Sequence, residues 1–176
     1  MWLYKTNEDN TARYILGQIN EEKGATLLCF GINPSTACPE CLDNTIRKVV
    51  KLSANNGYAN WIMVNIYPQR ATNPNDLHLA ADKKLCGENI AYIEELVKTY
   101  PNCDILLAYG NLIKKRDYLK DCLNDILNCL QGRSVRVIKM TKSNNPVHPL
   151  YQKDNAQFLI LNDDERIALV LNNKED

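Results

Sequence analysis

Short apolar runs alternate with amphipathic stretches along most of this chain, and that alternation limits the folds open to it. The clearest run extends from Leu27 to Gly31 and stops in small and polar residues from Asn33 onward. Five successive apolar residues are typical of a strand that is covered on both faces. Two further apolar runs predict strands over residues 61–66 and 104–110. A fourth strand is predicted over residues 135–140, where apolar residues alternate with Arg136 and Lys139, so one of its faces is expected to be wetter than the other.

Between these runs, apolar residues recur at the spacing of a helix with one buried face. The first such helix is predicted between Asp43, a favourable N-cap residue, and Gly57, a favourable terminator. Two more are predicted over residues 82–98 and 112–130. Strands that alternate with helices favour a parallel sheet joined by right-handed crossovers. We therefore predict a three-layer α/β/α fold with a mainly parallel sheet of four or five strands.

The two ends of the chain carry weaker patterns. Residues 12–16 fit either a strand or a helix, and their aromatic and β-branched side chains favour a strand. The length of 176 residues suits one domain, 1–176, with its core expected over about residues 11–152. The tail, residues 153–176, is predicted to form a short helix, a possible edge strand and a frayed end, over 155–161, 166–171 and 172–176.

Composition narrows the classes of function. Lysine plus arginine equals aspartate plus glutamate at 21 each, so no global positive field draws the chain to polyanions, and any such site must be local. No apolar run reaches the roughly 18 residues that span a bilayer, and the amino terminus lacks the order of a signal peptide. We expect no membrane association and a cytoplasmic location.

Seven cysteines are an odd number, which favours reduced thiols over a disulfide framework. Cys38 and Cys41 form the one C-x-x-C motif. A zinc site would need two more ligands at suitable spacing, and His78 and His148 stand far apart in the sequence. A redox pair is the other reading of this motif, but incidental loop thiols are favoured. We expect neither a metal nor a cofactor.

Polar side chains follow each of the four main strands. In a parallel sheet these loops gather at one edge, where such folds bind ligands. Each residue alone could satisfy a turn or pack in the core, but four such strand ends together favour a shared site. The candidates, in chain order, are Gly31, Asn33, Pro34, Ser35, Asn65, Tyr67, Arg70, Tyr109, Gly110, His148, Pro149 and Tyr151.

At these residues the chain resembles a known family. The motifs are G-I-N-P-S-T-A, D-x-T-I-R, V-N-I-Y-x-x-R-A-T-x-P, the Y-G after the third strand, and P-x-H-P-L-Y, in order from about Arg13 to Tyr151. Together they resemble domain-of-unknown-function family 1643, a bacterial and phage family with no settled activity. That family usually has Trp where Tyr109 stands.

The order of the motifs is also similar, more distantly, to that of the uracil-DNA glycosylase superfamily. That resemblance implies a uracil-DNA-glycosylase-like fold in which Asn33 positions the attacking water, Asn65 reads the base and His148 stabilises the departing base. An amide can donate and accept at once, and an imidazole can donate to an oxygen that gains negative charge. The most active branches have Asp at the position of Asn33, and Asn cannot act as a general base.

The leading expectation is therefore a hydrolase that acts on a nucleobase, nucleotide or nucleic acid by cleaving an N-glycosidic bond. The alternative is a binding module that recognises a nucleotide or nucleic acid in the same pocket without catalysis. A third reading, a small-molecule hydrolase with Cys38, Cys41 or Ser35 as nucleophile, is weaker because the chain has no G-x-S-x-G elbow. Leu150, in H-P-L-Y where the superfamily usually has H-P-S, could wedge into a base stack or simply pack.

Overall fold

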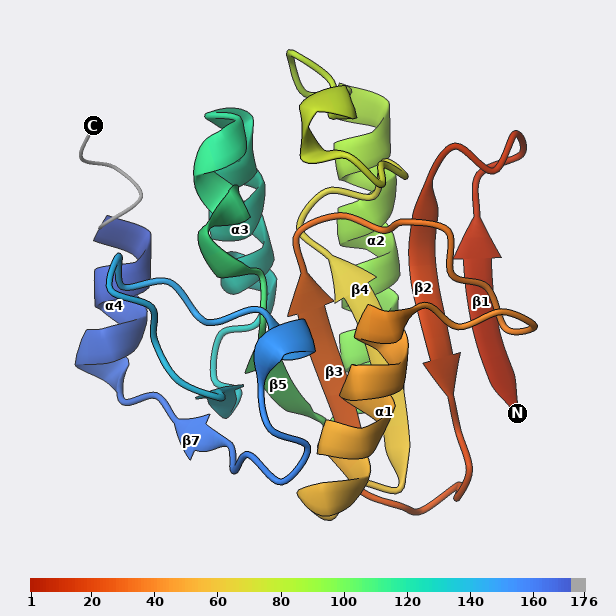
Figure 1. Ribbon diagram of the computed structural model, residues 1–176, viewed down its shortest axis with the longest axis vertical. Helices are drawn as coiled ribbons and strands as arrows, with labels where there is room; N and C mark the ends of the chain where they lie inside the picture. Colours follow the sequence, from red (N-terminus) through yellow and green to blue (C-terminus); the bar gives the residue numbers. More distant parts are fainter. Residues whose placement is uncertain (172–176) are drawn as a thin grey trace.

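The computed structural model describes residues 1–171, and a seven-stranded sheet runs through it in the order β1-β2-β4-β3-β5-β6-β7 (Figure 1). The four strands β4, β3, β5 and β6 are parallel and adjacent, whereas β1, β2 and β7 run antiparallel to their neighbours. The strands are β1 Trp2–Thr6, β2 Arg13–Gln18, β3 Thr26–Gly31, β4 Asn60–Asn65, β5 Asp104–Leu107, β6 Val135–Val137 and β7 Leu159–Ile160.

The sheet is therefore mixed and has seven strands, which corrects the expectation of four or five mainly parallel ones. The four apolar runs all form strands, and they are the four parallel ones. The weak pattern near residue 12 is also a strand, β2. The prediction missed the outer strands because β1 is largely half-buried or exposed and β7 is two exposed residues long, so neither carries the apolar pattern of a covered strand.

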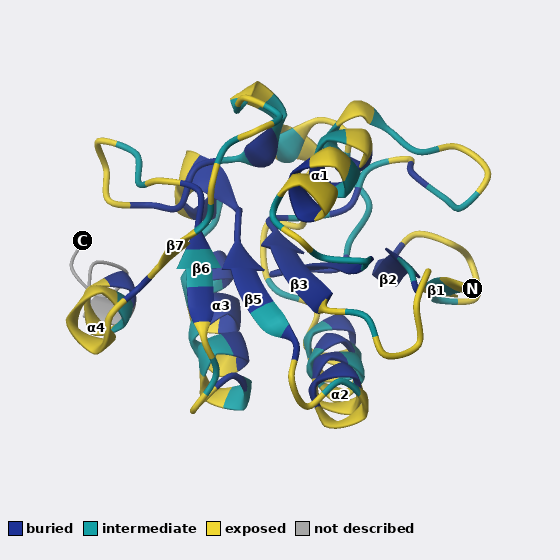
Figure 2. Cartoon of the chain, turned by 90° about the horizontal axis from the view of Figure 1, so that it is seen from below, coloured by how far each residue is buried: buried dark blue, intermediate teal, exposed yellow. Residues whose placement is uncertain are grey.

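Helices cover both faces of the sheet, with α1 over one face and α2 and α3 over the other (Figure 2). The predicted N-cap of α1, Asp43, is confirmed, and Asp82 caps α2. Asp43 accepts a hydrogen bond from Ile46 N at 2.8 Å, and Asp82 accepts from Lys84 N at 2.8 Å. The helices are α1 Asn44–Asn55, α2 Lys83–Thr99, α3 Tyr118–Cys129 and α4 Asp163–Leu171, with the 3₁₀ turns η1 Pro74–Asp76, η2 Gly110–Lys115 and η3 Pro149–Tyr151.

The helix predicted over residues 112–130 is interrupted. Gly110 adopts a positive φ of 68° and starts the turn η2, and Arg116 is extended before α3 begins. The Arg116 guanidinium donates to the carbonyl oxygens of Asn75 and Leu77, each at 3.0 Å. These long-range hydrogen bonds fix Arg116 between η2 and α3, and the local sequence does not predict them.

The tail corrects two further predictions. The segment expected to be a helix, 155–161, contains strand β7, and the segment expected to be a strand, 166–171, lies in helix α4. A reciprocal capping box starts α4: Glu165 N donates to Asn162 Oδ1 at 2.9 Å, and Asn162 N donates to Glu165 Oε2 at 2.8 Å. The predicted frayed end, 172–176, lies outside the described residues.

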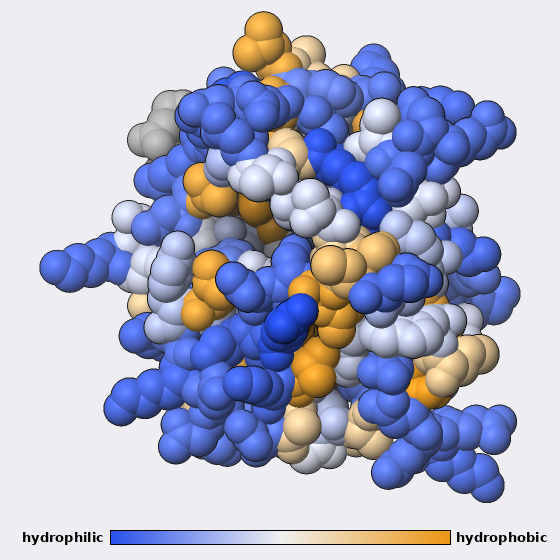
Figure 3. All heavy atoms as spheres, turned by 45° about the vertical axis from the view of Figure 1, so that its right-hand side comes forward, coloured by the Kyte–Doolittle hydropathy of each residue, from blue (hydrophilic) through white to orange (hydrophobic). Residues whose placement is uncertain are grey.

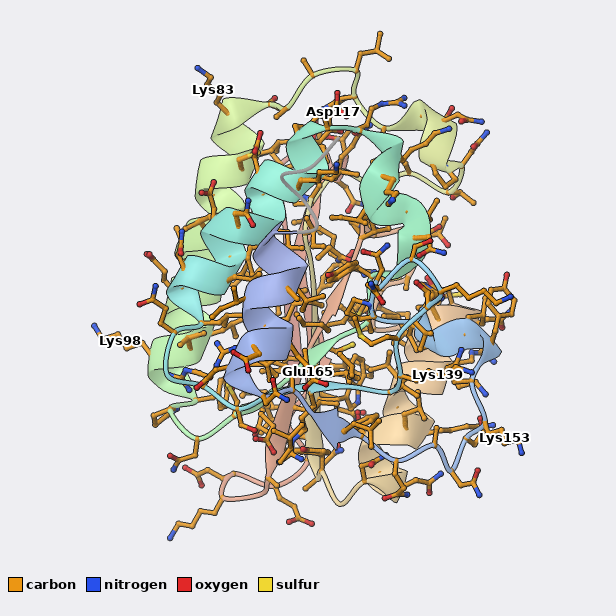
Figure 4. The ribbon with its side chains drawn as sticks, turned by 90° about the vertical axis from the view of Figure 1, so that its left-hand side faces the viewer. Lys83, Lys98, Asp117, Lys139, Lys153 and Glu165 are labelled. Carbon is orange, nitrogen blue, oxygen red and sulfur yellow. The ribbon has the colours of Figure 1, made fainter. Side chains whose placement is uncertain are left out.

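No helix within residues 1–171 combines the length and the apolar content needed to cross a bilayer. Figure 3 shows a surface on which apolar side chains form small groups between hydrophilic ones. Lys83 and Lys98 project outward from opposite ends of α2 (Figure 4).

Candidate functional site

The loops that leave the parallel strands run side by side beyond the carboxyl edge of the sheet. Backbone hydrogen bonds of 2.9 Å join Ile66 N to Gly31 O and Ala71 N to Pro34 O, so the chain after β3 continues alongside the chain after β4. A bond of the same length joins Gly110 N to Pro146 O. Backbone hydrogen bonds therefore join the loop after β3 to the loop after β4, and the loop after β5 to the loop after β6.

Asn65 ends β4 with its side chain over Gly31 of the neighbouring strand. A Cβ atom at Gly31 would lie 2.8 Å from Asn65 Oδ1, so the bare glycine makes room for this amide. Asn65 is 1% exposed, and its Nδ2 has no hydrogen-bond partner among the described residues. A buried donor without a partner is rare in folded proteins and marks a place that a water or a ligand can complete.

His148 is the N-cap of η3, and its ring is held in one orientation. Leu150 N donates to His148 Nδ1 at 3.3 Å, which leaves the ring proton of the neutral imidazole on Nε2. Burial lowers the pKa of His148, and the nearby Asp43 carboxylate partly opposes that effect. The side chain is therefore a neutral imidazole near pH 7 with Nε2–H available as a donor.

Both amide protons of Asn33 are used in hydrogen bonds to the backbone. Asn33 Nδ2 donates to Ala71 O at 2.8 Å and to Pro34 O at 3.0 Å, which ties the β3 loop to the β4 loop. No donor among the described residues reaches Asn33 Oδ1, so this oxygen is free to accept a hydrogen bond. Pro34 is buried next to it.

Ser35 and Arg70 lie farther along the same two loops. Ser35 Oγ is 2.9 Å from Thr72 Oγ1, and both side chains line a cavity of about 270 Å³ together with Arg70. Arg70 donates to the carbonyl oxygens of Ser35 and Ala37. This cavity is not lined by Asn33, Asn65 or His148.

Tyr67 and Tyr109 face the other side of the sheet, in the core under α2 and α3. The Tyr67 hydroxyl lies 2.7 Å from His78 Nδ1 and accepts from Asp82 N at 2.9 Å, so Tyr67 anchors the start of α2. Tyr109 is fully buried, and burial raises its pKa. The structure thus places these two rings away from the face that carries Asn65 and His148.

The remaining candidates lie around His148. Gly110 adopts its left-handed conformation beneath this residue, where an added Cβ would come 3.3 Å from His148 Cβ. Pro149 is buried in η3, whereas Tyr151 is 85% exposed with its ring centroid 6.5 Å from that of His148. Gly110 therefore supports the histidine, and Tyr151 offers a free aromatic face beside it.

Comparison with known proteins supports the family resemblance. A family model described as "Protein of unknown function (DUF1643)" matches residues 13–150. The chain belongs to this family. No curated protein and no solved structure gave a significant match.

Two residues inside the segment matched by the DUF1643 model were not among the predicted site residues. Arg13 starts β2, and because β2 runs antiparallel to β4, its first residue lies at the carboxyl edge of the parallel strands. Asp43 interacts electrostatically with both Arg13 and His148. The D-x-T-I-R motif did single out Asp43, but only as a helix cap.

The cysteines of this DUF1643 chain are free thiols. Cys38 and Cys41 face each other across a tight turn through backbone hydrogen bonds of 3.2 and 3.1 Å. Cys86 Sγ lies 3.6 Å from Cys122 Sγ, a proximity that their sequence separation does not reveal. Within the described residues, no group of three or more His, Cys, Asp or Glu side chains could hold a metal ion.

Proposed function

We propose that this protein recognises a nucleobase, within a nucleotide or a nucleic acid, at the carboxyl edge of the sheet on the α1 face, and that it hydrolyses the N-glycosidic bond. The observation that carries this proposal is the state of His148. Its Nδ1 accepts from the backbone, its pKa is lowered, and its Nε2–H is a neutral donor. A donor of this kind suits a carbonyl oxygen that gains negative charge as a base departs.

The proposed reaction adds water to the sugar carbon and releases the base with the electrons of the broken bond. His148 Nε2–H would stabilise the departing base, and the unpaired Asn65 Nδ2 would donate to a carbonyl on its edge. Asn33 Oδ1 would hold the water by accepting a hydrogen bond from it, and the proton that the water loses would pass to solvent or to the released base. An amide cannot remove that proton, so the stabilisation of the leaving group carries most of the rate enhancement.

The surface beside His148 supports a nucleic-acid ligand. Tyr151 presents an exposed ring, which can stack on a base. Next to it, a groove of about 540 Å³ between α1 and η3 is lined by Leu150 and three basic side chains, those of Arg47, Lys48 and Lys51. Lys48 and Lys51 share one acidic partner, Asp154, so the groove keeps a net positive charge. Leu150 at its floor fits both a packing role and a wedge.

The distant relation to uracil-DNA glycosylases belongs to the same proposal. Its support is that the residues matched to the water-positioning, base-reading and leaving-group roles follow three different strands of one parallel set and lie at one edge. A mainly parallel layering of that kind describes the four central strands here. The edge strands β1, β2 and β7 are additions to it.

The test is release of free base, measured by chromatography, from single-stranded and mismatched DNA containing uracil or other altered bases and from free nucleosides. His148→Ala should lower the rate about 10²- to 10³-fold, the usual cost of losing such a donor. Asn33→Ala should cost less in the chemical step, because Asn33 Oδ1 only orients the water, although the variant also loses the two hydrogen bonds of Asn33 Nδ2 to the loop backbone. His78→Ala is the matched control, since the other histidine pairs with Tyr67 on the opposite face, and its rate should be unchanged. Base release that His148→Ala leaves intact would refute the mechanism.

A second candidate, the binding module, is favoured by one observation: both amide protons of Asn33 are committed to backbone carbonyls, as in a structural tie. It predicts that wild-type protein releases no base from any substrate of the panel. His148→Ala and Asn65→Ala would then weaken ligand binding without changing any turnover. Binding to DNA should fall only shallowly with salt, because few basic residues are available to meet phosphates.

A further inference from the structure

Two arginines meet behind the loop that follows β3. Arg13 Nη1 donates to Ala37 O at 2.9 Å, and Arg70 Nη1 reaches the same oxygen at 3.3 Å. Arg70 also donates to Ser35 O, to Tyr4 Oη at 2.7 Å and to Asn10 Oδ1. All of these acceptors are neutral, so two positive charges stand side by side without an anion between them.

Neither guanidinium has a carboxylate within ion-pair distance in residues 1–171. Arg13 is 2% exposed, and its Nε is buried with no hydrogen-bond partner. Burial and the neighbouring Arg70 lower the pKa of Arg13 to about 10, so it remains charged at pH 7. A buried charge without a paired anion is costly, and Asp43 compensates only through space.

Other arginines of the chain show what a purely structural role looks like. Arg116 and Arg133 also hold loops by donating to backbone carbonyls, but each does so alone. Holding residues 35–37 would need only one guanidinium in the same way. The second guanidinium, that of the buried Arg13, therefore needs another explanation.

A cavity opens beside Arg70, the more exposed of the two arginines. Arg70, Ser35 and Thr72 line its space of about 270 Å³, along with Asn10, Thr36 and Ala71. The two hydroxyls lie 2.9 Å apart and bond to each other, so one proton is used between them and the other is free to donate to a bound oxygen. Arg70 uses one of its two Nη2 protons on Tyr4, which leaves the other available. No acidic side chain lines the cavity.

We propose that this cavity binds a phosphoryl group, which would contact Arg70 directly and offset the charge of Arg13, which does not line the cavity, through space. Guanidinium and hydroxyl donors suit the tetrahedral oxygens of phosphate. This inference rests on the proposed function for the rest of the ligand: the phosphate of a nucleotide or of a nucleic-acid strand would sit here while the base lies near Asn65 and His148. The two positions are linked through Asn33, whose amide donates to Ala71 O at the cavity wall.

Isothermal titration calorimetry with four probes tests the site: inorganic phosphate, a deoxynucleoside, its 5′-monophosphate and a single-stranded oligonucleotide. Wild-type protein should bind inorganic phosphate with 1:1 stoichiometry and bind the monophosphate at least tenfold more tightly than the nucleoside. If the oligonucleotide binds more tightly than the monophosphate, the ligand is a phosphate of a nucleic-acid strand. If the monophosphate binds more tightly, the ligand is a free nucleotide. Either outcome supports the site.

Two kinds of variant assign the binding to this cavity. Arg70→Met should weaken phosphate binding about tenfold or more, the usual effect of losing a charged hydrogen bond. Ser35→Ala/Thr72→Ala removes both hydroxyls while keeping Arg70, and should weaken binding severalfold without unfolding the loop. Arg116→Met is the matched control, because it removes an arginine that holds a different loop, and its phosphate affinity should match wild type.

The proposal is overturned if wild-type protein does not bind phosphate, or if both cavity variants bind it as tightly as Arg116→Met does. It also fails if the nucleoside and its monophosphate bind equally. If the nucleoside still binds and Asn65→Ala abolishes that binding, the proposed base site is supported and the phosphate site alone is refuted. Phosphate binding without any base release would support the site while removing the hydrolase proposal.

Discussion

Replacing Gly31 with alanine tests whether this glycine makes room for the Asn65 amide. The new Cβ would lie 2.8 Å from Asn65 Oδ1 and 2.5 Å from Met63 Cε. The Met63 methyl ends a flexible side chain and can rotate away. Asn65 is short and 1% exposed, so its amide must move if the methyl is to fit.

Overpacking of this kind costs about 1–3 kcal/mol. The loss of backbone freedom in the unfolded chain offsets roughly 0.4–1 kcal/mol of that, since Gly31 is not among the residues with positive φ. The net destabilisation should be about 1–2 kcal/mol. At roughly 2–4 °C per kcal/mol for a chain of this size, Tm should fall by about 2–8 °C.

The assay is a double-mutant cycle by urea denaturation with Gly31→Ala, Asn65→Ala and both together. Asn65→Ala removes the atom that the new methyl meets, so the double variant should recover about 0.5 kcal/mol or more of the summed cost. Gly17→Ala is the control, because its Cβ would meet Trp61 O at 2.8 Å rather than Asn65, and it should be additive with Asn65→Ala. Additivity in the Gly31 pair would refute the packing argument.

Two further predictions concern stability. Burial lowers the pKa of His148 in the folded state, so the unfolded chain takes up a proton first as pH falls below about 6.5, and the free energy of unfolding should fall with it. His148→Gln should reduce the difference in unfolding free energy between pH 7 and pH 5.5, measured by urea denaturation. An unchanged difference would contradict this prediction. Asn60 accepts hydrogen bonds from the backbone N–H groups of Asn20 and Glu21 and donates to Glu21 O and Gly24 O. Asn60→Ala should therefore lower the free energy of unfolding, measured by chemical denaturation, by about 2–4 kcal/mol. Asn20→Ala loses one exposed hydrogen bond and should lower it by less than about 1 kcal/mol.

The parallel core could be predicted because its signals are local. Leu27 to Gly31 is buried on both faces, and such a strand must be apolar at every position rather than at alternate ones. The caps Asp43 and Asp82 act within one turn of their own helices. The four buried strands and the Asp43 cap, which needed only neighbouring residues, were therefore confirmed, whereas the weaker local patterns of the tail predicted the wrong elements.

What failed depends on distant partners. The direction of β2 is set by its pairing with β4, and only that direction brings Arg13 to the carboxyl edge. The sequence around Arg166 fits either a strand or a helix. In the structure it is helical: the capping box at Asn162 starts the helix, and the Arg166 guanidinium donates to Arg133 O and Leu130 O, far away in the sequence. For the site, the shared edge followed from parallel connections. The face of each residue did not, because Tyr67 and Tyr109 lie beyond the last residues of β4 and β5, where strict alternation ends. Ile66 and Tyr67 both lie in the core under α2 and α3, opposite Asn65.

Buried polar atoms without partners point back to the same edge. Real proteins break local rules of polar satisfaction mainly where function requires it. Within the described part of the chain, four of the side chains with such atoms lie at the carboxyl edge or against it: Arg13, Asn65, Asn89 and Tyr109. Asn89 donates to Asn65 O, so even the backbone under the proposed base reader is held from α2. The unpaired Asn65 Nδ2 faces the proposed base position, and Arg13 shares the acceptor Ala37 O with Arg70, which lines the proposed phosphate cavity. A base joined to a phosphate would therefore meet Asn65 directly and Arg13 through space.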